Sequence, residues 1–299
     1  MFRALYKKEL LSASRNLKMP AFIIANNVIL AFVTIFAYYL EVASRPKWEQ
    51  TASGVQVLNI FCMLFLIEYG LGIVLILALS IPSVYSDRRN HSFDLILMSG
   101  ASALKYILAK LASRVTICIL IIFSSAPIFG FVFYIGGVSL QDFGFLLMVL
   151  LVTIIYIASI GIFFSSHCRK RAAATISTYT VVLLILVGTL ITFGGIYLMK
   201  KVNMGVEIDD TNRLITIGNL MYILVINPLY GILRFFHEHF GTMSQIRKYL
   251  FVYHKSLIIR EQWVLVSSLI QLAISTVLIF ISARKLRIGK RNTKRAILN

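Results

Sequence analysis

The sequence is short of charged residues, cysteines and prolines, and each shortage excludes a class of protein. Only 14% of its 299 residues are charged, whereas soluble domains carry roughly 25%, which excludes a soluble enzyme. A disordered chain is excluded because 59% of the residues are hydrophobic. The three cysteines show neither the spacing of a disulfide framework nor that of a zinc site. Five prolines and seventeen glycines leave no room for a long flexible linker.

What the chain does contain is a series of long apolar runs, and its mean hydropathy is +0.84. A helix needs about 20 consecutive apolar residues to cross a bilayer. We therefore predict an all-α integral membrane protein whose residues 1–299 form a single transmembrane domain with six spans. The predicted spans are residues 21–40, 60–81, 115–135, 145–164, 176–198 and 264–283.

One further apolar segment, Leu214–Ile226, ends at Asn227-Pro228 and has only thirteen residues. It is therefore too short to cross the membrane. It is typical of an interfacial or re-entrant helix. A seventh span would also place the basic tail, residues 284–299, outside the cell, against the positive-inside rule.

Acidic residues are also scarce, since 12 Asp and Glu stand against 30 Lys and Arg. Twenty of those 30 basic residues lie on one side of the predicted topology, in the N-terminal segment, the loops after spans two and four, and the tail. The positive-inside rule therefore predicts a protein of the cell membrane with both termini in the cytoplasm. Because topology explains the basic charge, we expect no nucleic-acid partner, and we expect the tail to contact anionic lipids.

Residues 1–18 predict an amphipathic helix at the membrane interface. At helical spacing Phe2, Tyr6 and Leu10 share one face, and lysines occupy the other. Glu9 lies on the apolar face and interrupts the pattern. The alternative is a simple basic anchor before the first span.

The loop after the second span, residues 82–110, is the most informative segment. A dense polar cluster, Asp87–His91, is followed by a short predicted helix, Phe93–Ser99, that is apolar nearly all round. A helix of that kind should not remain in water. It requires a groove, either on a soluble partner or beneath its own bundle.

This loop resembles the corresponding loop of ABC-2 type transporter permeases, which also have six spans and an N-terminal interfacial helix. Members of that family carry acidic and basic residues, then a pattern such as Gly-Thr-Leu-Glu-Leu-Leu-Leu, a small residue, and Gly-Lys before the third span. The matching residues here are Asp87-Arg88-Arg89, His91–Leu97, Ser99-Gly100 and Ala109-Lys110. Asp87 replaces the usual Glu and Ala109 the usual Gly, which leaves the subfamily open.

The resemblance implies the membrane subunit of an ATP-driven exporter. It also implies two partners: an ABC ATPase subunit, and a second copy or a related permease in a homo- or heterodimer. In that family the loop holds the coupling helix that docks on the ATPase, and the loop after span four is a second candidate contact. The alternatives are a loop packed beneath its own bundle and a simple basic turn. The implied interface residues are Asp87, Arg88, Arg89, Asn90, His91, Phe93 and Asp94, with Arg169 and Arg171 from the second loop.

The sequence contains no Gly-x-x-x-x-Gly-Lys-[Ser/Thr] run to cradle nucleotide phosphates. We therefore expect a protein that is not an enzyme and holds no cofactor, with ATP and Mg²⁺ bound by the partner subunit. A secondary transporter or channel, a membrane enzyme and a structural subunit of an assembly complex remain alternatives. The first of these would call for several intramembrane charges and broken spans.

Glu68 is an acidic residue within the second predicted span. A charged side chain at such a depth costs roughly 2.5 kcal/mol or more, so it faces the protein interior or a polar cavity. Two interpretations stay open: a group on the substrate path, and a carboxyl group hydrogen-bonded to a neighbouring serine, tyrosine or carbonyl.

The long segment 199–262 is predicted to form an external helical insertion between the last two spans, with helical stretches near Tyr230–Phe240 and Tyr249–Tyr253. It contains the pair His237-x-His239, a spacing that can ligate zinc. No further ligand follows at a recognisable spacing, so we predict no metal site.

Overall fold

A computed structural model describes residues 2–43, 54–89, 102–135, 138–168, 170–204, 219–240 and 257–298. Throughout these ranges the regular structure is helical and no strand occurs, which confirms the all-α fold class. Six helices are long and apolar enough to cross a membrane, as predicted. These candidate spans are Met19–Ala43, Val55–Asp87, Ala103–Phe123, Leu140–His167, Arg171–Ile196 and Gln262–Leu286.

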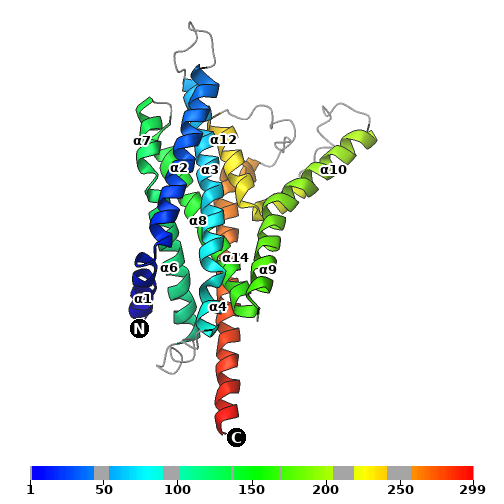
Figure 1. Cartoon of the computed structure of the whole chain (residues 1–299). Coiled ribbons are helices and arrows are strands. Elements are labelled where there is room, and N and C mark those ends of the chain that lie inside the picture. The colour runs from blue at the N-terminus through cyan, green and yellow to red at the C-terminus, as the bar shows by residue number, and fades with distance from the viewer. Residues whose placement is uncertain are drawn as a thin grey trace.

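The spans form an elongated bundle with both chain termini at the same end (Figure 1). Helix α1 (Phe2–Ser14) lies at that end beside α6 (Ala103–Phe123), and the Tyr6 hydroxyl lies 3.0 Å from Thr116 Oγ1. A short turn leads into α2 (Lys18–Tyr38), which continues as a π-helical turn, η1, over Tyr39–Ala43.

The centre of the bundle is α8 (Leu140–His167), which packs against α3 (Gly54–Ser80), α6 and α14 (Leu257–Leu298). Over its most apolar stretch, 67% of the residues in the fourth span are buried inside the chain, against 11% in the fifth. The fourth span is therefore a core helix of the bundle, whereas most of the surface of the fifth span is free to contact lipid or another protein.

A turn at Ile81 divides the second span, where α3 ends and α4 (Pro82–Arg89) begins. The first amides of a helix lack partners within the helix. Here the Ser165 hydroxyl of α8 accepts hydrogen bonds from the Val84 and Tyr85 amides, at 3.2 and 3.1 Å. The close approach of α8 requires glycine at position 161, because a Cβ there would lie 2.9 Å from Ser80 Cβ. Helix α4 is therefore fixed to the bundle at its start.

The third expected span, 115–135, is not one helix. Helix α6 ends at Phe123, and after Ser124 and Ser125 the chain continues as α7 (Ala126–Ile135). Pro127 explains the break, because proline lacks an amide donor and its ring clashes with the carbonyl four residues earlier. The candidate span is Ala103–Phe123, which begins and ends twelve residues before the expected one.

The fifth span is built from α9 (Arg171–Leu183), a π-helical segment η3 (Leu184–Gly188) and α10 (Thr189–Met204). In Figure 1 α10 diverges from the bundle. The insertion that follows contains the 3₁₀ helix η4 (Asn219–Ile226) and α12 (Pro228–Phe240). Residues 214–218 and the helix expected near Tyr249–Tyr253 lie outside the described residues.

Asn227 connects the insertion to the fifth span. Its side-chain oxygen accepts a hydrogen bond of 2.9 Å from the Leu229 amide, which caps α12. Its amide nitrogen donates to the Leu186 carbonyl at 2.9 Å and to the Thr189 hydroxyl at 2.8 Å. The carbonyl belongs to η3, so one side chain stabilises both the start of α12 and the irregular part of the fifth span.

Phenylalanines fill the end of the bundle opposite the termini, which we call the aromatic end. The Phe61 ring is fully buried and meets the Phe129 ring edge to face at a centroid distance of 6.1 Å and the Phe240 ring at 5.9 Å. These contacts join α3, α7, α8 and α12. The members are Phe61, Phe65, Phe129, Phe133, Phe143, Phe235, Phe236 and Phe240.

Candidate functional site

At the end that carries the termini, which we call the basic end, four charged side chains form one network. Lys110 Nζ lies 2.7 Å from Glu9 Oε1 and 2.8 Å from Asp87 Oδ2. Arg114 Nη2 donates to Glu9 Oε2 at 2.8 Å, and the Tyr106 hydroxyl donates to Asp87 Oδ2 at 2.7 Å. Among the residues that the structure describes, the network joins α1, α4 and α6 through two acids and two bases.

Lys110 is the centre of this network, and its side chain is only 4% exposed. A lysine is rarely buried to that extent unless it is paired. Removal of one partner from a buried ion pair costs about 3–5 kcal/mol, because the other charge is left uncompensated. The two acids therefore hold α1 and α4 against the same turn of α6.

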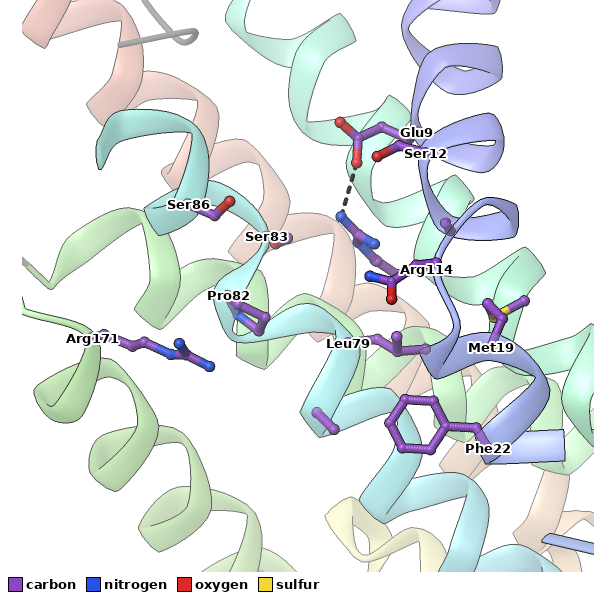
Figure 2. Close-up of a pocket in the computed structure, with 13 residues that line it drawn as sticks. Glu9, Ser12, Met19, Phe22, Leu79, Pro82, Ser83, Ser86, Arg114 and Arg171 are labelled. Carbon is purple, nitrogen blue, oxygen red and sulfur yellow. Dashed lines mark hydrogen bonds and ion pairs between the residues drawn. The ribbon is translucent and has the colours of Figure 1, made fainter. Parts of the chain in front are cut away.

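A cavity of about 440 Å³ lies beside the network, between α9 on one side and α1 and α2 on the other, with α3 and α4 behind it (Figure 2). Its wall has a polar part and an apolar part. The polar lining includes Glu9, Ser12, Asn16, Ser86, Arg114 and Arg171, and the apolar lining includes Met19, Phe22, Leu79 and Pro82.

The residues proposed for an ATPase interface fall into four groups. Asp87 turns inward, since Lys110 and Tyr106 hold its carboxylate. Arg89 ends α4 and is exposed, and Arg171 begins α9 and is also exposed. Arg88 lies in α4 without a described side chain. Asn90, His91, Phe93, Asp94 and Arg169 lie outside the described residues.

Glu68 lies inside the bundle and is 1% exposed. Its carboxyl group accepts a hydrogen bond from the Asn26 side-chain amide at 3.2 Å and one from the Ser125 hydroxyl at 3.1 Å. Asn26 belongs to α2 and Ser125 to the break between α6 and α7. The side chain thus connects three parts of the bundle and does not line the cavity at the basic end.

Both histidines of the His237-x-His239 pair lie on α12. The His239 ring stacks on Phe235 with centroids 4.2 Å apart, and its Nδ1 lies 3.8 Å from Asp142 Oδ1. Across the described ranges, no group of three or more His, Cys, Asp or Glu side chains is arranged to hold a metal ion.

Sequence reasoning missed the network partners Glu9, Lys110 and Arg114. Two signals could have found them. A single acid on the apolar face of a basic helix requires a buried cation, and residues four positions apart, such as Lys110 and Arg114, share one helix face. Similarly, Asn26 in the first span is a polar side chain that needs a partner inside the membrane.

Comparison with protein families supplies the remaining observation. The family model described as "ABC-2 family transporter protein" matches residues 7–284. The chain belongs to this family. A comparison with curated proteins gave no match. Membership together with six apolar helices makes the protein a multi-pass membrane permease of an ABC transporter.

Proposed function

We propose that this ABC-2 permease forms a substrate path for export, driven by ATP that a separate ABC ATPase subunit hydrolyses. The family match over residues 7–284 is the observation that carries the proposal. The absence of a phosphate-binding loop from the sequence supports a division of labour between two subunits. The direction, export, is what the likeness to this family implies.

The surface proposed to meet the ATPase is the tip of α4 with the segment that follows it. Ser165 fixes the start of α4, and the ion pair of Asp87 with Lys110 fixes its last turn. A force applied at Arg89 would therefore reach α6 and α8 directly. In this proposal α4 moves as a rigid body with α6 and α8. Asp87 positions α4 and does not itself contact the ATPase.

A second permease copy, or a related permease, is proposed to pack on the fifth span. Exposed small residues, such as Thr180, Thr192 and Gly195, are spaced among its exposed apolar side chains. Small residues allow helix backbones to approach closely in membranes, where van der Waals packing drives association. The low burial of the fifth span within one chain also supports its use as the contact surface for a second permease.

The test of the ATPase partnership is co-purification of the tagged permease with a nucleotide-binding subunit in mild detergent. Arg89→Ala and Phe93→Ala should reduce the bound ATPase or uncouple ATP hydrolysis from transport, since truncating an interface anchor costs about 2 kcal/mol or more. Arg15→Ala, at an exposed position after α1, is the matched control. Full assembly and normal transport in both interface variants would mean that the loop packs beneath its own bundle.

The proposed orientation has its own test. In a background with Cys168 replaced by serine, a cysteine introduced at Asp209 should react with an impermeant reagent added to intact cells, and one at Lys290 should not. Cys62 and Cys118 are buried and should stay silent. Labelling of the tail in intact cells would overturn the placement of both termini in the cytoplasm.

A further inference from the structure

The cavity beside the ion-pair network contains cationic donors that the chain itself does not use. Its charged lining consists of one acid, Glu9, and two bases, Arg114 and Arg171. Glu9 is already shared between Lys110 and Arg114. The cavity is therefore positive overall.

Two guanidinium groups face this space from opposite sides. Arg171 extends from α9 toward Pro82 (Figure 2), and its guanidinium group has no ion-pair or hydrogen-bond partner among the residues that the structure describes. Arg114 reaches the cavity from α6. Its Nη2 is bound to Glu9, but its Nε is buried without a hydrogen-bond partner. Such a buried donor is costly unless something accepts from it.

The apolar part of the wall decides which anion fits. Met19 and Phe22 from α2 and Leu79 from α3 form the apolar part of the same lining. A small inorganic anion would leave this part unfilled. An amphiphile with a phosphate head and an acyl chain matches both parts, and a volume of about 440 Å³ lies within the range of ligand pockets.

We propose that this cavity binds the headgroup of an anionic phospholipid from the membrane leaflet at the basic end, with Arg171 and Arg114 as phosphate donors. Guanidinium groups recognise phosphate through paired, charge-assisted hydrogen bonds. The acyl chain lies along Phe22 and Leu79. Because the lining comes from α1, α2, α3, α4, α6 and α9, the lipid stabilises the contact between the N-terminal helix and the rest of the basic end.

The test compares Arg171→Gln with Lys170→Gln in the full chain. Both variants remove one positive charge from neighbouring exposed positions, but only Arg171 lines the cavity. Binding of phosphatidylglycerol and of phosphatidylcholine is measured by native mass spectrometry of the detergent-solubilised protein. The thermal midpoint without added lipid checks that each variant folds.

The wild type should bind phosphatidylglycerol more tightly than phosphatidylcholine. Arg171→Gln should weaken that binding by about tenfold, since it removes a charge-assisted hydrogen bond. Lys170→Gln should change it by no more than about twofold, because an isolated surface charge contributes little. Ser86→Glu, which adds a negative charge to the cavity wall, should weaken binding as Arg171→Gln does.

Two results would overturn the proposal. Equal weakening by Arg171→Gln and Lys170→Gln would mean that the lipid responds only to the general positive charge of this end. Competition by inorganic phosphate at the same concentration as the lipid would mean that the cavity takes a soluble anion. Neither result would affect the proposed ATPase partnership, which has its own assay.

Discussion

The basic end and the aromatic end of the bundle are held together by different interactions. At the basic end, four charged side chains meet at distances of 2.7–2.8 Å. At the aromatic end, the Phe61 ring meets its neighbours at centroid distances near 6 Å. Charge-assisted hydrogen bonds are short and need a defined geometry, whereas ring contacts act mainly through the large apolar surface that they bury. The basic end therefore fixes helix orientation, and the aromatic end supplies packing.

The largest loss should follow Phe61→Ala at the aromatic end. The side chain is fully buried among rings from three other helices, so truncation leaves a cavity. We expect the free energy of unfolding to fall by about 3–5 kcal/mol, measured as a lower thermal midpoint in detergent. Phe131→Ala removes a ring that is 52% exposed and should have a far smaller effect. Equal losses would mean that the cluster does not hold this end together.

The next largest effect should follow Lys110→Met at the basic end. The change removes the Lys110 ammonium group from both Asp87 and Glu9. We expect a loss of about 3 kcal/mol, because buried acids lose a compensating charge. Lys105→Met, at an exposed position on the same helix, should stay within about 0.5 kcal/mol. A double-mutant cycle with Glu9→Gln should give a coupling of about 0.5–3 kcal/mol, and additive effects would contradict the network.

A smaller effect is expected at Asn227, which connects α12 to the fifth span. Asn227→Ala removes both the helix cap and the hydrogen bonds to Leu186 and Thr189, at a cost of about 1–2 kcal/mol. Asn227→Ser keeps an oxygen that can cap α12 and should recover part of this loss. Hydrogen exchange of α12 amides measures both. If serine and alanine behave alike, the link to η3 rather than the cap carries the effect.

The smallest change should follow Glu68→Gln, midway between the two ends. Glutamine can still accept from Ser125 and Asn26 after a local amide adjustment, so stability should change by less than about 1 kcal/mol. Glu68→Leu leaves the Asn26 amide without its acceptor, although the Ser125 hydroxyl can still donate to the Ile122 carbonyl at 2.6 Å, and should cost about 1–3 kcal/mol. Transport by the glutamine variant distinguishes the two interpretations. Normal transport means that Glu68 joins helices, and lost transport in a stable variant means that it belongs to the substrate path.

Much of the fold could be predicted from apolar run lengths, because each bilayer crossing demands about 20 apolar residues whatever its neighbours are. The break after Phe123 could also have been predicted from Pro127. It was missed because the apolar run continues through the proline and has the length of a span. The position of Glu9 indicates that it needs a buried cation, but the sequence does not say which one, since Lys110 and Arg114 lie about a hundred residues away. Pairing over that separation depends on how α1 and α6 meet.

The sequence by itself determined the six apolar helices, the asymmetry of basic residues and the family pattern after the second span. Each of these follows from local composition against the requirements of a bilayer. Only the tertiary structure decided that Asp87 faces Lys110, that Glu68 meets Asn26 and Ser125, and that Arg114 and Arg171 face one cavity. Those contacts join helices that are distant in the chain, and their partners are selected by packing rather than by any property of a single segment.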